Sequence, residues 1–99
     1  MNAKTYITPL HFSLSADTRT QIDGAVRPLF SQDVYVGRVD VTIDGEYSNN
    51  TSILYSVTIR AQLRSEVLFE IVRGKKILPA VEAATLALQN RLTPAPSHA

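Results

Sequence analysis

The chain has 99 residues, enough for one domain and too few for two, and its ten lysines and arginines nearly balance nine acidic residues. A net charge of +1 gives no general attraction to polyanions. There is no cysteine, which excludes disulfides and thiolate metal sites, and no apolar run approaches the length that spans a membrane.

The basic residues are concentrated toward the C-terminal half. Six of the ten lie from Arg60 onward, where only three acidic residues accompany them. This local excess hints at a nucleic-acid partner. The segment Met1–Lys4 leads into a strand-like stretch without the apolar core of a signal peptide, so a cytoplasmic location is expected.

A strand and a helix are predicted first. The strand covers Thr5–Thr8 and ends at Pro9, which fits only the edge or end of a strand. Ser15 is a suitable helix N-cap, and Asp17 in the first turn favours the helix dipole. Pro28 removes a backbone donor, so we expect a kink or an early end there. The apolar face of this helix recurs at helical spacing: Ile22, Ala25, Val26, Leu29 and Phe30.

Three strands should follow, because apolar and polar residues alternate over 38–44, 53–64 and 67–71. Asp44-Gly45 and 48–50 are expected to mark a loop between the first two. The link at Arg64-Ser65 is so short that the last two strands must form an antiparallel hairpin. The residues expected to point at the helices are Val39, Val41, Ile43, Tyr55, Val57, Ile59, Val67, Phe69 and Ile71.

A second helix is predicted after Gly74-Lys75-Lys76, which breaks the last strand. Pro79 fits its first turn, and Thr93-Pro94 ends it. We therefore expect one domain over residues 1–93 and a flexible tail over 94–99. The buried stripe of the helix should comprise Ile77, Val81, Ala84, Thr85, Leu88 and Leu92.

The order of these elements fixes the expected topology. A strand, a helix and a strand imply a right-handed crossover, so the first strand should lie parallel to its neighbour, and the others form an antiparallel meander. Each helix has one apolar stripe and the sheet has one apolar face, so both helices should pack on that face. The expected class is α+β, in the order β-α-β-β-β-α, with a four-stranded mixed sheet like that of double-stranded-RNA-binding domains.

Residues for catalysis or cofactor binding are not grouped in the sequence. The only internal histidine is His11, without partners at metal-binding or catalytic spacing, and no glycine-rich phosphate loop occurs. The acidic residues of the strands are expected on the water-facing side of the sheet, where they would form cross-strand ion pairs with arginines. The acidic residues are Asp40, Asp44, Glu66 and Glu70, and the arginines are Arg38, Arg60 and Arg64. No enzyme activity, cofactor, metal or small-molecule substrate is expected.

Three segments resemble the ribosome-associated hibernation factors, also called the sigma-54 modulation or ribosomal-subunit-interface family. Ile7-Thr8 followed by Phe12–Ser15 resembles the opening strand and helix cap of that family. The apolar face of the first helix, followed by Val34–Val36, resembles its first helix and the exit from it. Gly74–Glu82, ending in Asn90–Leu92, resembles the glycine-led second helix. The resemblance extends from Ile7 to Thr93 and implies the same fold.

The resemblance also implies a function. Members bind rRNA of the small ribosomal subunit, where mRNA and tRNA sit, and block translation in idle cells. They use lysines and arginines on both helices, but here Ala25 and Pro28 occupy positions that are lysine-rich in the family. The residues implied as phosphate partners are Arg19, Arg27, Arg73, Lys75, Lys76 and Arg91.

An alternative is that the fold was kept and the partner changed. The outward face of the second helix is nearly uncharged, and such a face suits a protein partner or a homodimer. On this interpretation ribosome binding is weak or lost. The residues of the face are Ala83, Leu86, Ala87 and Asn90.

Overall fold

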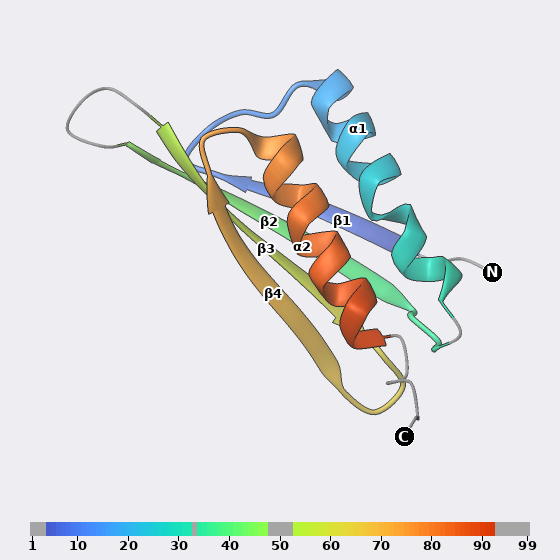
Figure 1. Cartoon of the computed structure of the whole chain (residues 1–99). Helices are drawn as coiled ribbons and strands as arrows, with labels where there is room; N and C mark the ends of the chain where they lie inside the picture. The colour runs from blue at the N-terminus through green and yellow to red at the C-terminus, as the bar shows by residue number, and fades with distance from the viewer. Residues whose placement is uncertain (1–3, 33, 48–52, 93–99) are drawn as a thin grey trace.

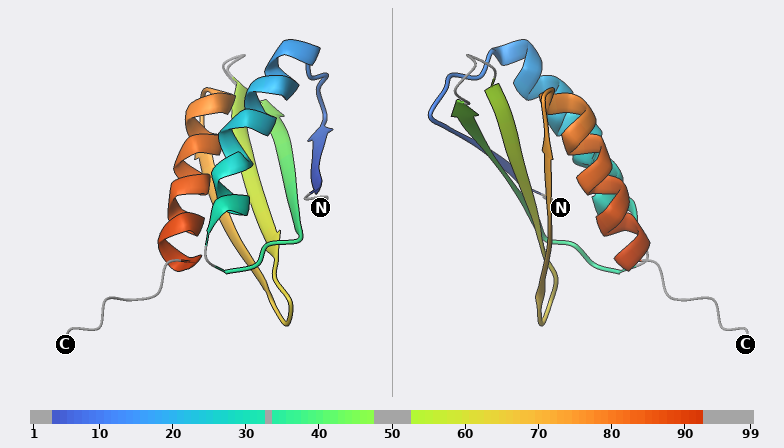
Figure 2. Two further views of the ribbon diagram at one scale, coloured as in Figure 1. Left: turned by 90° about the vertical axis from the view of Figure 1, so that its right-hand side faces the viewer. Right: turned by 60° about the vertical axis from the view of Figure 1, so that its left-hand side comes forward.

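The structure is a computed structural model that describes residues 4–32, 34–47 and 53–92. Four strands form one sheet, and two α-helices lie side by side on one face of it (Figures 1 and 2). The elements are β1 Lys4–Leu10, α1 Ala16–Val26, the 3-10 helix η1 Arg27–Ser31, β2 Arg38–Tyr47, β3 Ile53–Gln62, β4 Val67–Gly74 and α2 Ile77–Leu92. The predicted tail at 94–99 and the predicted loop residues 48–50 lie outside the described residues.

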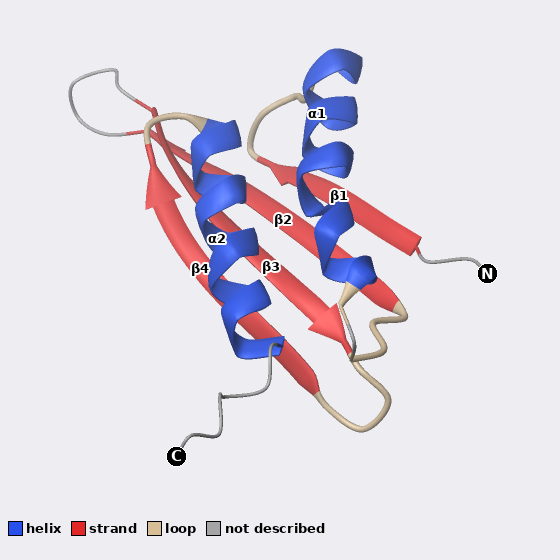
Figure 3. Cartoon of the chain, turned by 45° about the vertical axis from the view of Figure 1, so that its right-hand side comes forward, coloured by secondary structure: helices blue, strands red, loops and turns tan. Residues whose placement is uncertain are grey.

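The strand order is β1-β2-β3-β4 (Figure 3). β1 runs parallel to β2, and the β2–β3 and β3–β4 pairs are antiparallel. The predicted α+β class, the element order and the placement of both helices on one face are therefore confirmed. One sheet face is covered by helices, and the other, which we call the open face, is not.

The first helix begins and ends where its sequence signals lie. The Ser15 hydroxyl accepts a hydrogen bond from the Thr18 N–H at 3.1 Å, which caps the N-terminus. α1 ends at Val26, and Pro28 lies in the 3-10 turn that follows, as expected of a residue that cannot continue an α-helix. β1 runs on through Pro9 to Leu10, beyond its predicted end, which an edge strand tolerates.

β2 also continues further than predicted. Asp44-Gly45 was expected to turn the chain, but the strand runs to Tyr47, and Gly45 pairs with Tyr55. The Phe12 ring covers Gly45 so closely that an added Cβ would lie 3.2 Å from it. Phe12 and Tyr55 then meet edge to face at 5.4 Å between ring centroids. Gly45 thus gives room for an aromatic pair rather than a turn.

The core lies between the helices and β2 and β3. The inward side chains predicted for these strands are buried, with Val39, Ile43, Val57 and Ile59 all at 0% exposure, except that Tyr55 is half-buried against the core. The predicted stripe of α2 is buried with them, except that Ile77 is half-buried. The buried members are Val81, Ala84, Thr85, Leu88 and Leu92.

The predicted orientation of β4 is wrong. Val67, Phe69 and Ile71 lie on the open face, with exposures of 39%, 52% and 54%. Leu68 and Val72 point at the helices instead and pack against the core. The cause is the hairpin: β3 contributes its odd-numbered residues to the core, and the register pairs Ala61 with Leu68, so even-numbered β4 residues share that face.

Two further predictions about charged strand residues need correction. Glu70 was expected to face water but lies on the helix side of β4, where Arg91 of α2 reaches its carboxylate at 3.0 Å. Asp40 was expected in a cross-strand pair with an arginine. Its ion pair joins Arg38 on the same strand at 3.0 Å, although the register places Arg60 directly opposite.

Candidate nucleic-acid interface

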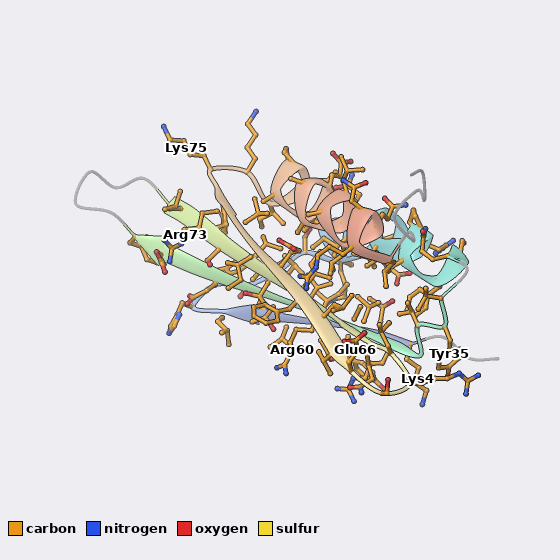
Figure 4. All side chains as sticks on the ribbon, turned by 60° about the horizontal axis from the view of Figure 1, so that its bottom comes forward. Lys4, Tyr35, Arg60, Glu66, Arg73 and Lys75 are labelled. Atoms are coloured by element: carbon orange, nitrogen blue, oxygen red, sulfur yellow. The ribbon has the colours of Figure 1, made fainter. Side chains whose placement is uncertain are left out.

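Two lysines occupy the turn between β4 and α2. β4 ends at Gly74 and α2 begins at Ile77, so Lys75 and Lys76 are the only residues between them. Both are exposed, and neither forms a hydrogen bond or ion pair with the described part of the chain. In Figure 4, Lys75 projects away from the end of β4. With Pro79 they line a shallow depression of about 370 Å³.

The location of these lysines has an electrostatic consequence. The first N–H groups of a helix have no intrahelical partners and give its N-terminus a partial positive charge. Two ammonium groups just before α2 add to that charge instead of offsetting it. An anion such as a phosphate would relieve the repulsion and could also accept backbone hydrogen bonds. The β4–α2 turn is therefore the part of the described surface with the clearest preference for an anion.

Arg73 does not join the lysines as the sequence suggested. It is exposed on β4 and lies opposite Ser56 in the register. Strand alternation therefore places its side chain on the open face, with Phe69 and Ile71. The predicted cluster of three basic residues is split between the turn and the open face, and Figure 4 labels Arg73 and Lys75 at these two places.

Arg19 of α1 and Arg27, the first residue of η1, both have partners within the protein. The Arg19 guanidinium donates to the Ile7 carbonyl of β1 at 3.0 Å, beside a shallow depression between β1 and α1. Arg27 pairs with Asp23 one helical turn earlier, at 3.3 Å, with both side chains largely exposed. Exposed pairs of this kind are weak, so the Arg27 contact could exchange for a phosphate at little cost.

Arg91 is the most firmly held of the six. One of its terminal nitrogens donates to the Phe69 carbonyl at 2.9 Å and to the Glu70 carboxylate at 3.0 Å. Both partners belong to β4, at the edge of the sheet opposite the one that holds Arg19. The six predicted residues therefore do not converge on one groove between the helices.

The outward face of α2 is placed as predicted. Ala83 and Asn90 are exposed, Leu86 has 59% exposure and Ala87 is half-buried. The face is nearly uncharged, but it offers one large side chain. The larger exposed apolar surface is the stripe on β4, which the sequence analysis assigned to the core.

Two aromatic–arginine contacts were not predicted, one between β1 and β2 on the open face and one between the loops that precede β2 and β4. The Arg38 guanidinium lies 4.3 Å from the centre of the Tyr6 ring, and Arg64 lies 4.5 Å from that of Tyr35. A hydrogen bond to Asp40 raises the pKa of Arg38, so this cation is held in a charged network. The first contact depends on the β1–β2 register, which places Tyr6 opposite Asp40, the ion-pair partner of Arg38.

The described residues were also compared with the requirements of a metal site and of a membrane-spanning helix. No group of three or more acidic or histidine side chains among the described residues could hold a metal ion. His11 is exposed and pairs with Asp44 at 2.7 Å. None of the helices in the described ranges combines the length and the apolarity needed to cross a membrane.

The fold is that of a small α+β domain found in solved structures of other proteins. The crystal structure of the Thermus thermophilus Protein Y N-terminal domain matches with a TM-score of 0.71 and 14% identity, over 93% of this chain and 96% of that one. A ribosomal subunit interface protein from Coxiella burnetii matches with a TM-score of 0.70 and 11% identity, over 90% and 92%. The sequence matches no family model, and it matches no curated protein.

These matches confirm the structural likeness that the sequence resemblance implied. They extend over nearly the whole of each chain, so the agreement concerns the complete β-α-β-β-β-α arrangement. Identities of 11% and 14% establish a shared fold. A shared fold does not by itself imply a shared partner.

Proposed function

We propose that this protein binds rRNA of the small ribosomal subunit and thereby blocks translation in idle cells. It acts by binding, without catalysis or cofactor, and its partner places it in the cytoplasm. The observation that carries the proposal is the pair Lys75 and Lys76 at the N-terminus of α2, without partners among the described residues, in a chain with the fold of a ribosomal subunit interface protein.

Phosphate contacts support the proposal physically. Contacts to the phosphate backbone supply most of the affinity of proteins for nucleic acids, and a helix N-terminus flanked by lysines suits that contact. Arg27 can join at low cost, because its exposed pair with Asp23 is weak. Arg19 and Arg91 would have to give up hydrogen bonds to backbone carbonyls first. We therefore expect few phosphate contacts, and a correspondingly shallow slope of log affinity against log salt.

The test is co-sedimentation of the protein with purified small subunits across a salt series. We expect the protein to pellet at low salt and to be released as salt rises. Large subunits serve as the control for general attraction to RNA, and they should retain less protein at every salt concentration. Failure to pellet with small subunits at the lowest salt, or equal pelleting with both subunits, would contradict the proposal.

A second candidate function is a protein-interaction module on the same scaffold. The observation that favours it is the apolar surface exposed at Leu86 on α2. In that case the protein would stay in the supernatant with either subunit, and Leu86→Glu would disrupt its complex with the protein partner.

A further inference from the structure

The open face of the sheet carries an aromatic ring on each of its two outer strands. The register places Tyr6 of β1 opposite Asp40 of β2. Asp40 lies opposite Arg60 of β3, and Arg60 lies opposite Phe69 of β4, so the four side chains form one row across the sheet. Tyr6 is 41% exposed and Phe69 is 52% exposed. Because neighbouring strands are about 4.8 Å apart, the two rings are separated by about 14 Å, and each is available to a different flat partner.

Two arginines accompany these rings. The Arg38 guanidinium lies 4.3 Å from the centre of the Tyr6 ring, and its bonds to Asp40 hold it in that position. Arg60 is exposed and has no hydrogen bond or ion pair with any described residue. A guanidinium is flat, stacks on nucleic-acid bases as it stacks on rings, and binds phosphates through several N–H donors. The row therefore offers flat surfaces for stacking and free donors for an anion.

The charge of the open face is uneven. Among the described residues, the half of this face beside the β3–β4 hairpin carries three basic side chains and one acidic one, whereas the other half carries two acidic side chains and one basic one. The first half contains Lys4, Arg38, Arg60 and Asp40, and the second contains Asp44, Glu46 and Arg73. In Figure 4, Lys4 and Arg60 project on the side of the sheet away from the helices. The aromatic row thus lies in the positive half, which is complementary to an anionic partner that contains flat rings.

A row of hydroxyl groups adjoins the aromatic row. Thr8, Thr42 and Thr58 lie abreast on β1, β2 and β3, each two positions along its strand from a member of the aromatic row. None of the three hydroxyls has a hydrogen-bond partner among the described residues. A hydroxyl both donates and accepts, so these groups can bond to the edges of bases and to a ribose 2′-OH. The hydroxyl row therefore favours RNA over DNA.

We propose that the open face binds single-stranded RNA. One base stacks on Phe69 and another on the pair formed by Arg38 and Tyr6, while Arg60 binds a phosphate. Only an unpaired strand can present the faces of its bases to the rings, so a duplex is excluded. Figure 4 shows Arg60 and Lys75 on different sides of the molecule, so this site is separate from the β4–α2 turn. The inference does not depend on binding to the small subunit.

The experiment is fluorescence anisotropy of a labelled uridine oligomer of about 12 nucleotides, titrated with the full chain at low salt. Wild type should bind the oligomer saturably. Phe69→Ala should weaken binding by about 10-fold, as the loss of one base–aromatic stack does. Leu86→Ala is the matched control, because Leu86 is 59% exposed but lies on α2, and it should leave binding unchanged.

Charge reversal tests the phosphate contact. Arg60→Glu should weaken binding by about 10-fold and should lower the slope of log affinity against log salt by about 0.7, the value for one contact to a single strand. Lys75→Glu changes the net charge equally at another exposed position, and it should stay within about 3-fold of wild type. A deoxyuridine oligomer and an RNA duplex of the same length should both bind less tightly than the RNA single strand. Circular dichroism checks that every variant is folded.

Three results would overturn the proposal. The first is a wild type that does not bind the RNA oligomer at about 500 μM protein. The second is a loss with Leu86→Ala or Lys75→Glu as large as the loss with Phe69→Ala or Arg60→Glu. The third is a DNA oligomer or a duplex that binds as tightly as the RNA single strand. Co-sedimentation with small subunits tests the proposed function separately, and Arg60→Glu should pellet with them as wild type does.

Discussion

The guanidinium of Arg91, in the last turn of α2, donates a hydrogen bond to the backbone carbonyl of Phe69 on β4 at 2.9 Å. The same nitrogen meets the Glu70 carboxylate, whose side chain is only 29% exposed. Arg91 thus ties the C-terminal end of α2 to the edge of the sheet. This role is structural, and it competes with the phosphate contact that the sequence resemblance implied for Arg91.

Arg91→Ala should lower the free energy of unfolding by about 1–2 kcal/mol, because it removes two hydrogen bonds and leaves a half-buried carboxylate without its partner. Urea denaturation measures the change. Arg27→Ala is the control: its pair with Asp23 is exposed, so the loss should stay under about 0.5 kcal/mol. Equal small losses in both variants would show that Arg91 is free to act elsewhere.

The orientation of β4 predicts unequal effects for neighbouring positions. Leu68→Ala should cost about 2–3 kcal/mol, because Leu68 packs against the core. Ile71→Ala should cost less than about 1 kcal/mol, because its side chain is 54% exposed. Urea denaturation compares them. A larger loss at Ile71 would mean that the assigned register is off by one residue.

Thr85 offers a stabilising substitution. Thr85 belongs to the buried stripe of α2 and is only 3% exposed. Its hydroxyl oxygen has no hydrogen-bond partner among the described residues. Thr85→Val keeps the shape and removes the buried polar group, so the free energy of unfolding should rise by about 1 kcal/mol. Thr20→Val is the control, since the Thr20 hydroxyl is exposed and bonds to the Ala16 carbonyl. A drop in stability with Thr85→Val would point to a partner for the hydroxyl.

Most of the fold could be predicted because the strands and helices have clear periods. In β2 and β3, apolar residues fall on alternate positions, so one face was assigned correctly. In β4 both faces are apolar, and the more apolar set was assigned to the core. The hairpin register predicts the buried face of β4 correctly. The two-residue link at Arg64-Ser65 pairs Leu63 with Glu66, so Leu68 lies on the same side of the sheet as Leu63.

The candidate site was less predictable because it depends on distant contacts. Lys75 and Lys76 are adjacent in sequence, and they stay together in the turn. The contacts of Arg19 with Ile7 and of Arg91 with Phe69 join residues 12 and 22 positions apart, and no local pattern encodes them. The pair Asp23–Arg27 is different, since its spacing of four residues on a helix predicts it from the sequence alone.

The most direct test of the account concerns the lysines of the β4–α2 turn. Binding to small subunits should be measured across a salt series for wild type, for Lys75→Glu with Lys76→Glu, and for Lys4→Glu with Arg64→Glu. Both double variants lower the net charge equally, from +1 by four to −3, and all four side chains are exposed. We predict that the turn variant loses affinity and that its slope of log affinity against log salt falls by about two units, one per phosphate contact, whereas the control variant stays close to wild type. Equal loss in both variants would mean that net charge alone governs binding, and it would contradict a specific role for Lys75 and Lys76.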